Sequence, residues 1–393
     1  MKLHLYPALC LFAIFVFSSA SSAPSAQIQA PDSTVFPTPA KHLIIMDSDS
    51  GEILFEKNAR IPMAPASMTK IMTASVVFDR IKAGTLSLDD EFIVSEDAWR
   101  RGGVSSGSST MFLNPKSKVS VRDLLHGVVI QSGNDACITL AEGIAGSEGA
   151  FALLMNEKAQ QLGLTSAHFT NATGWPDAEH VISAYDLARL ARHTINAYPE
   201  MYKIYAKESY TWNGIKQPNR NPLLMAGFSG ADGLKTGHTE ISKYGFVGSA
   251  VQNGNRRIFV VNGLESKAER RSESLRIMRS AFGEFAVYEL YKMDANIGTA
   301  NVFMGVSETV PLVTKQAVNI GMHKSQRPDM KVQIQYLGPL PAPILQGDQI
   351  AELVISVGGQ TVKTIPLYAG TDIELKSLFG RLTASLVREI RGE

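Results

Sequence analysis

A serine and a lysine three residues apart form the first pair of side chains in this chain that could do chemistry. Ser67-Met68-Thr69-Lys70 is the only S-x-x-K in the sequence, and the apolar residues after it predict a helix. Residues three apart share a helix face, so the Ser67 hydroxyl can meet the Lys70 amine. A lysine whose neutral form is accessible near pH 7 can act as a base toward a serine nucleophile. Taken alone, the pattern is more typical of a helix N-cap serine followed by an exposed lysine.

A second polar segment interrupts two apolar stretches that are expected to be helical. Gln131-Ser132-Gly133-Asn134-Asp135-Ala136 lies between Val121–Ile130 and Cys137–Ala141. Two helices joined in this way would hold the Ser132 hydroxyl and the Asn134 amide on a short, well-fixed turn. A merely polar helix connection is the alternative for this segment.

A third segment precedes a predicted β-hairpin. Its sequence is Gly233-Leu234-Lys235-Thr236-Gly237-His238-Thr239. Apolar, β-prone runs over Lys243–Val251 and Arg257–Leu264 follow, separated by Asn253-Gly254-Asn255, which is a strong hairpin signal. A lysine, a hydroxyl and a glycine at a strand start could present a cation, a donor and open backbone to an extended substrate.

The three segments in this order form the S-x-x-K, S-x-N, K-T-G signature of penicillin-binding proteins and class A β-lactamases. The chain resembles the low-molecular-weight penicillin-binding proteins that act as D-alanyl-D-alanine carboxypeptidases. The resemblance covers Pro65–Ala74, Leu124–Ala136, Gly233–Thr239 and the C-terminal region. It implies an α/β (α+β) β-lactamase/transpeptidase-like catalytic domain, with a five-stranded antiparallel sheet and helices, followed by a small all-β sandwich.

The resemblance also implies a role for each catalytic side chain. Ser67 would be the nucleophile that forms an acyl-enzyme, and Lys70 would take its proton. Ser132 would relay a proton to the leaving D-alanine and, with Lys235, keep the charges of the site in order. Asn134 would hold the peptide group of the substrate.

Substrate-binding residues follow from the same resemblance. The backbone N–H groups of Ser67 and His238 would form an oxyanion hole. Thr236, beside Gly237 in the K-T-G segment, and Arg220 in Asn219-Arg220-Asn221 would bind the terminal carboxylate, since a planar guanidinium suits a carboxylate. Arg270 would assist, or would be a solvated arginine within the charged run 267–271.

The expected substrate is the pentapeptide stem of peptidoglycan, and β-lactam antibiotics are the expected inhibitors. Neither a metal nor a cofactor is expected. A class A β-lactamase is one alternative, but Glu179 has Ser183 four residues later, so the Glu-x-x-x-Asn feature of that family is missing. Two further functions stay open, a cell-wall D,D-endopeptidase and a non-catalytic cell-wall binding protein.

The composition and the two ends of the chain indicate where the protein is located and which partners it can have. The chain has 393 residues, with Lys+Arg 38 against Asp+Glu 37, and this balance argues against a nucleic-acid partner. Lys2, the apolar run Leu9–Phe17 and the small residues Ser18–Ala26 have the order of an export signal. We predict a signal peptide over 1–26, with an uncleaved anchor as the alternative, and a linker over 27–40.

Beyond the linker we predict a catalytic domain over 41–292, a β-sandwich over 293–373 and an amphipathic helix over 374–393. The large apolar residues of that last segment fall on one stripe of a 3.6-residue helix: Leu375, Leu378, Phe379, Leu382, Leu386, Val387 and Ile390. Basic residues lie off the stripe, as in helices that bind an anionic membrane surface. Docking on the protein's own core is the alternative. The predicted location is the periplasmic face of the bacterial cytoplasmic membrane.

Overall fold

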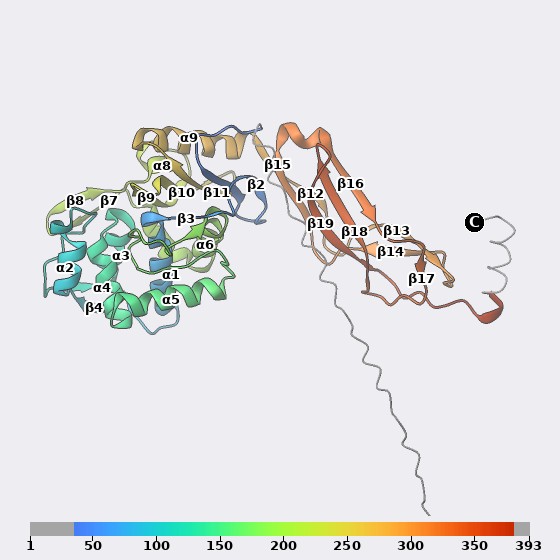
Figure 1. The fold of residues 1–393 in the computed structure, drawn as a ribbon, viewed down its shortest axis with the longest axis horizontal. Coiled ribbons are helices and arrows are strands. Elements are labelled where there is room, and N and C mark those ends of the chain that lie inside the picture. Colours follow the sequence, from blue (N-terminus) through green and yellow to red (C-terminus); the bar gives the residue numbers. More distant parts are fainter. Residues whose placement is uncertain (1–34, 381–393) are drawn as a thin grey trace, which may run out of the picture.

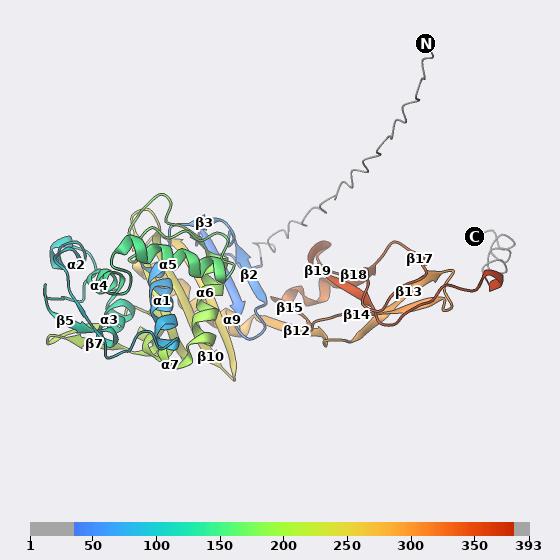
Figure 2. The ribbon, with the colours of Figure 1, turned by 90° about the horizontal axis from the view of Figure 1, so that it is seen from below.

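The structure of this chain is a computed structural model that describes residues 35–380. The predicted signal peptide, most of the predicted linker, and residues 381–393 of the predicted amphipathic helix lie outside the described residues. Figures 1 and 2 show two bodies joined end to end, a mixed helical and β body followed by an all-β body.

A five-stranded antiparallel sheet forms the centre of the first body, in the order β2-β1-β11-β10-β9. The hairpin of β10 and β11 is the one that the Asn253-Gly254 turn predicts. The predicted fold class is confirmed. The strands are β1 (His42–Asp47), β2 (Ile53–Lys57), β9 (Ala231–Thr239), β10 (Lys243–Gln252) and β11 (Asn255–Leu264).

Both faces of this sheet are buried, which explains why its strands appear in the sequence as almost continuous apolar runs. Along β1, Leu43 and Ile45 pack into the core beside α9, whereas Ile44 and Met46 pack into the larger core on the other face. Successive side chains of a strand point to opposite faces, so one strand serves two cores.

Helices cover the sheet on its two faces (Figures 1 and 2). The α-helices are α1 (Lys70–Lys82), α2 (Glu96–Gly102), α3 (Val121–His126), α4 (Asn134–Ala145), α5 (Glu148–Gln161), α6 (Ala184–Ala197), α7 (Pro199–Tyr202), α8 (Pro222–Met225) and α9 (Lys267–Gly283). The other helical segments are the 3-10 turns η1 (Ala66–Thr69), η2 (Val104–Ser106), η4 (Lys203–Ala206) and η5 (Lys324–Asp329), and the π-helix η3 (Gly127–Gln131). Short strand pairs join the connecting loops: β3 (Pro62–Met63) with β6 (Ile182–Ser183), β4 (Glu91–Ile93) with β5 (Lys118–Ser120), and β7 (Ser209–Trp212) with β8 (Ile215–Pro218).

The second body contains only strands and one 3-10 turn within residues 285–375. A six-stranded sheet has the order β16-β18-β19-β14-β13-β17, and β12 pairs with β15. The bounds are β12 (Phe285–Tyr291), β13 (Asn296–Phe303), β14 (Thr309–Val313), β15 (Val318–His323), β16 (Met330–Gln335), β17 (Leu340–Pro341), β18 (Gln349–Val357) and β19 (Gln360–Ala369). Alternate residues of β18 and β19 fill the core, which accounts for the period of two in the sequence.

The two bodies meet where β15 packs against β2. Lys363 Nζ donates to Glu52 Oε1 at 2.6 Å and to Asn319 O at 2.9 Å. Gly321 allows β15 to lie close to β2, because a Cβ at this position would lie 2.6 Å from Ile53 O. The strand β12 reaches this junction from α9, and the predicted boundary at residue 293 stays a prediction.

Within residues 35–380 no single helix is long and apolar enough to cross a membrane. Helices α4 and α5 together have sufficient length and apolar character, with an angle of 83° between them.

Candidate active site

The site begins at η1, which leads directly into α1 and carries Ser67. Ala66 has a φ of +49°, a backbone conformation that residues other than glycine adopt at an energetic cost. Such outliers concentrate at functional sites when the surrounding structure enforces them. Here the enforced turn sets Ser67 at the start of α1, where the positive end of the helix dipole favours developing negative charge.

Lys70 is the first residue of α1 and is almost completely buried. Its Nζ lies 3.2 Å from Ser67 Oγ, so the structure brings together the pair that the sequence predicts. The same nitrogen donates to Asn134 Oδ1 at 2.7 Å and to the backbone carbonyl of Thr173 at 2.6 Å. Three oxygen atoms therefore surround one amine.

Burial lowers the pKa of Lys70, because removing the ammonium from water penalises its charged form. The positive charge of Arg220 adds to this lowering, while Cys137, Glu148 and Asp135 oppose it. A lowered pKa brings the neutral amine, the form able to accept a proton from serine, closer to physiological pH.

Ser132 and Asn134 occupy the turn between the π-helix η3 and α4. Ser132 closes η3 with a φ of +62°. A π-helix is rare and occurs frequently at functional sites. Asn134 opens α4, with its Oδ1 toward Lys70 and its Nδ2 donating to Ser108 Oγ at 3.0 Å. Within the described chain the Ser132 hydroxyl makes no side-chain hydrogen bond, although the residue is 1% exposed.

Asp135 fixes the loop that faces this turn. Its carboxylate accepts hydrogen bonds from the Thr110 hydroxyl and from the backbone N–H groups of Met111 and Leu113. The preceding serine, Ser109, accepts a hydrogen bond from the Arg220 guanidinium at 2.6 Å. Asp135 thus positions the stretch of chain that contacts the predicted substrate-binding residues.

The K-T-G segment lies in β9, at the edge of the sheet, with Lys235 and Thr236 buried. Burial lowers the pKa of Lys235 well below its usual value, and the charges of Lys70 and Arg220 lower it further. Lys235 Nζ donates to Thr236 O at 3.2 Å. The charge of Lys70 thus disfavours the protonated form of Lys235.

Gly237 lets β9 approach the nucleophile turn. A Cβ at this position would lie 2.7 Å from Pro65 O and 3.2 Å from Met68 Cγ. The first of these contacts is with a backbone atom, which has little room to move away. Only a glycine at this position therefore lets β9 lie this close to η1.

The remaining predicted binding residues surround this strand. His238 is exposed and its ring lies against that of Tyr244, with 4.0 Å between centroids. Arg270, on α9, is 6% exposed and its Nη1 donates to Gly237 O at 3.2 Å. Burial lowers the pKa of Arg270 to about 10. Arg270 therefore supports the backbone of the K-T-G strand, and direct contact of Arg270 with substrate stays a prediction.

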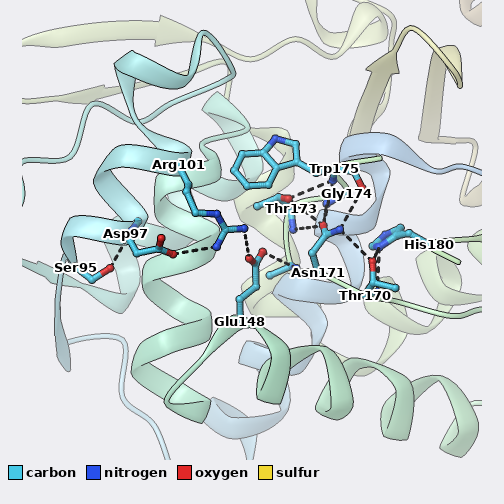
Figure 3. Close-up of polar contacts among 12 residues, drawn as sticks. Ser95, Asp97, Arg101, Glu148, Thr170, Asn171, Thr173, Gly174, Trp175 and His180 are labelled. Atoms are coloured by element: carbon cyan, nitrogen blue, oxygen red, sulfur yellow. Dashed lines mark hydrogen bonds and ion pairs between the residues drawn. The ribbon is translucent and has the colours of Figure 1, made fainter. Parts of the chain in front are cut away.

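Residues 170–180 form a loop, here named the lysine-acceptor loop, and Figure 3 shows its polar contacts. The Thr173 carbonyl of this loop accepts the hydrogen bond from Lys70. The Asn171 carboxamide oxygen accepts from the backbone N–H groups of Thr173, Gly174 and Trp175 at 3.2, 2.8 and 3.1 Å. At its other end His180 Nδ1 accepts from Thr170 N–H at 3.1 Å, so His180 Nε2 carries the proton shared with Thr69 Oγ1.

Two comparisons with family models divide the chain as the fold does. The model described as D-alanyl-D-alanine carboxypeptidase matches residues 27–266, more than half of the chain. The chain belongs to the D-alanyl-D-alanine carboxypeptidase family. The model of the C-terminal domain of penicillin-binding protein 5 matches residues 285–375, the all-β body.

Individual members of the carboxypeptidase family match almost the whole chain. The D-alanyl-D-alanine carboxypeptidase DacC of Escherichia coli is 37% identical over 94% of this chain and 92% of its own length. The enzyme DacA of Haemophilus influenzae is 35% identical over 90% of each chain. The crystal structure of DacD from Francisella tularensis is 33% identical and covers 90% of this chain and 98% of its own, with a TM-score of 0.77.

Sequence reasoning found the motif side chains but missed parts of the site that carry no residue-type signal. The Thr173 acceptor is a backbone carbonyl, which any residue supplies. Asp135, adjacent to the S-x-N motif, has a function that only its contacts show. Within residues 35–380 no group of three metal-ligating side chains comes together, and the expectation of catalysis without a metal stays a prediction.

Proposed function

We propose that this chain is a serine D-alanyl-D-alanine carboxypeptidase that removes the terminal D-alanine from peptidoglycan pentapeptide stems. The observation that carries the proposal is the contact of Lys70 Nζ with Ser67 Oγ at 3.2 Å in a site where Lys70 is buried. Membership of the carboxypeptidase family and the high coverage of its members support this function.

Acylation follows from this geometry. Neutral Lys70 accepts the Ser67 proton as Oγ bonds to the carbonyl carbon of the penultimate D-alanine. The carbonyl π electrons move to its oxygen, where the backbone N–H groups of Ser67 and His238 stabilise the oxyanion. Collapse of this intermediate breaks the C–N bond, and the leaving amine takes a proton through Ser132. An ester on Ser67 and free D-alanine result.

Deacylation reverses these roles with water as the nucleophile. Water adds to the ester carbonyl, loses a proton to the site base, and Ser67 leaves as the restored hydroxyl. A β-lactam acylates Ser67 in the same way, but its leaving group stays tethered to the acyl group, so a persistent ester blocks the site.

Substrate recognition needs a cation for the terminal carboxylate. We assign Arg220 and the Thr236 hydroxyl to this carboxylate, with Asn134 on the peptide group of the stem. In the structure Arg220 already binds the Ser109 hydroxyl, a neutral partner that a carboxylate can replace with a stronger, charge-assisted bond.

The two alternative functions, a class A-like β-lactamase and a D,D-endopeptidase, require features that differ from those of a carboxypeptidase. The β-lactamase needs a carboxylate that activates the deacylating water, whereas Lys70 here meets a backbone carbonyl and Glu179 is exposed. A D,D-endopeptidase would cleave cross-linked stems in preference to pentapeptides. The family assignment favours the carboxypeptidase over both of these functions.

We also propose that the protein is exported to the periplasmic face of the cytoplasmic membrane and rests there through residues 374–393. The basic amphipathic pattern of that segment and the export-type N-terminus support this location. The all-β body then separates the catalytic site from the lipid surface (Figure 1).

Release of D-alanine from a D-Ala-D-Ala-terminated pentapeptide tests the proposed activity. The wild-type protein is expected to release one D-alanine per peptide, and Ser67→Ala is expected to release none while keeping the wild-type circular dichroism spectrum. Release that persists in Ser67→Ala would refute the serine mechanism. Cleavage confined to cross-linked dimers would establish the endopeptidase instead.

A further inference from the structure

The orientation of the Lys70 amine depends on an acceptor that the motifs do not supply. A neutral amine has two N–H bonds and one lone pair. Asn134 Oδ1 and Thr173 O can only accept, so they take the two N–H bonds and leave the lone pair directed at Ser67 Oγ. The position of the Thr173 carbonyl therefore determines whether Lys70 is aligned as a base.

Internal hydrogen bonds shape the lysine-acceptor loop but cannot fix it to the rest of the fold. The Asn171 carboxamide ties Thr173, Gly174 and Trp175 to one another. A turn held only in this way could still shift as a unit. At the neighbouring position, the Ala172 carbonyl accepts from Thr73 Oγ1 of α1 at 2.6 Å.

Glu148 supplies a further external anchor (Figure 3), in addition to Thr73 at Ala172 and Thr69 at His180. It is the first residue of α5, and its side chain is 11% exposed. One carboxylate oxygen accepts from Ala172 N–H at 3.1 Å, and the other pairs with Arg101 of α2 at 2.9 Å. The carboxylate thus joins the loop to two helices.

Arg101 is held in turn from two further sides. Its other terminal nitrogen pairs with Asp97 at 2.9 Å, and its guanidinium carbon lies 5.2 Å from the centroid of the Trp175 ring. A guanidinium that lies over an aromatic ring and pairs with two carboxylates is pre-organised for its role. The Trp175 contact returns to the same loop that Glu148 holds.

We propose that the Arg101–Glu148 ion pair is a positioning device for the reaction. Glu148 holds Ala172 N–H, this fixes the Thr173 carbonyl, and the carbonyl aims the Lys70 lone pair at Ser67. The inference rests on the proposed serine acyl-transfer function, and it adds two positioning residues outside the three motifs. Neither residue is proposed to touch the substrate.

A purely structural role for Glu148 makes a different prediction. A carboxylate in the first turn of a helix stabilises that helix through the dipole, whatever the loop does. Loss of that effect would lower the melting temperature but would leave the acylation rate constant of the folded protein at the pH optimum unchanged. The charged groups that act on Lys70 are Glu148, Arg220 and Asp135, with the Cys137 thiol and Lys235 beside them.

The test compares acylation rates of purified wild-type, Glu148→Ala, Glu148→Gln and Arg101→Gln proteins with benzylpenicillin across pH. Glu148→Ala removes the acceptor of Ala172 N–H and is expected to lower the acylation rate constant by about 10- to 100-fold, as small misplacements of catalytic groups do. Arg101→Gln is expected to lose about fivefold, which corresponds to ~1 kcal/mol.

Glu148→Gln keeps an oxygen acceptor but loses the charge, so it separates position from electrostatics. Its rate at the pH optimum is expected to fall about fivefold, as in Arg101→Gln, because either change breaks the ion pair. The Glu148 charge raises the pKa of Lys70, so its removal is expected to move the acidic limb of the pH profile to lower pH. Arg122→Gln, which breaks the exposed Arg122–Asp89 pair of 2.8 Å, is the matched control and should change neither.

An acylation rate of Glu148→Ala within twofold of wild type would overturn the inference, and so would an Arg101→Gln rate equal to that of wild type. If benzylpenicillin acylates the wild-type protein, either of these results leaves the proposed function intact. A wild-type protein that benzylpenicillin does not acylate would refute the proposed function, and the inference with it. Should Glu148→Ala fail to fold, the Glu148→Gln and Arg101→Gln proteins decide.

Discussion

Lys70 Nζ lies 3.2 Å from Ser67 Oγ and 2.6 Å from the backbone carbonyl of Thr173. The amine thus bridges the nucleophile and a loop more than one hundred residues away, in a position 1% exposed to water. Burial lowers the pKa of this lysine. In the proposed mechanism, this lysine between a serine and a carbonyl is the base, and no histidine is needed.

Replacement of Lys70 by arginine tests the base directly. Lys70→Arg keeps a positive charge and donors but stays protonated at any physiological pH. Because general base catalysis contributes about 10²- to 10⁴-fold, we expect acylation by benzylpenicillin to slow by that factor. Stopped-flow measurement of acylation checks this, and a rate within tenfold of wild type would show that another group removes the Ser67 proton.

Gly237→Ala tests the close approach of the K-T-G strand to the nucleophile turn. The added Cβ would lie 2.7 Å from Pro65 O, so β9 and η1 must separate. We expect acylation to fall by about 10- to 100-fold while the protein still folds. Gly283→Ala, at the end of α9, meets no atom within 4 Å and serves as the control. Equal acylation rates in both variants would contradict the proposed fit.

His180 predicts a pH-dependent stability. Burial lowers its pKa to about 4, while the unperturbed value is 6.5. Between these values the unfolded state binds one proton more, so the free energy of unfolding rises with pH. The contribution of about 3 kcal/mol is complete above pH 6.5 and disappears as the pH falls toward 4.

Urea unfolding at several pH values checks this prediction. His180→Gln removes the titrating ring, so its stability is expected to fall less than that of the wild type between about pH 7 and pH 4.5. Nδ1 accepts Thr170 N–H at 3.1 Å, which protonation would abolish. Parallel pH curves for the two proteins would show that His180 is not held neutral.

Membrane attachment through residues 374–393 is tested on the full chain. Leu386→Asp places a charge on the apolar stripe and is expected to abolish sedimentation with anionic lipid vesicles. Ala384→Asp adds the same charge on the opposite side of the predicted helix, nine positions from Leu375, and is expected to retain binding. Unchanged binding of Leu386→Asp would exclude this segment as the anchor.

The sequence predicted those parts of the fold in which local pattern and tertiary contact agree. The Asn253-Gly254 turn predicts the β10–β11 hairpin, and the spacing of Ser67 and Lys70 predicts their contact. The ends of the strands in the predicted β-sandwich, such as those of β13 and β14, do not follow from local pattern, because they depend on pairing across the sheet.

Other features depend on contacts that no local pattern reveals. The strand β15 has a weak β signal in the sequence because Gly321 interrupts it, and the packing of β15 against Ile53 explains this glycine. Arg101 and Glu148 lie 47 positions apart, and nothing next to either residue in the sequence distinguishes it from an ordinary charged residue. The role of Arg270 beneath the K-T-G strand depends equally on its burial in the folded protein.

Intact-protein mass spectrometry after brief exposure to benzylpenicillin, followed by peptide mapping, tests the central claim most directly. The account predicts a single, long-lived adduct of one penicillin on Ser67, and none in Ser67→Ala. An adduct on another residue, or a folded wild-type protein that gains no mass, would contradict it.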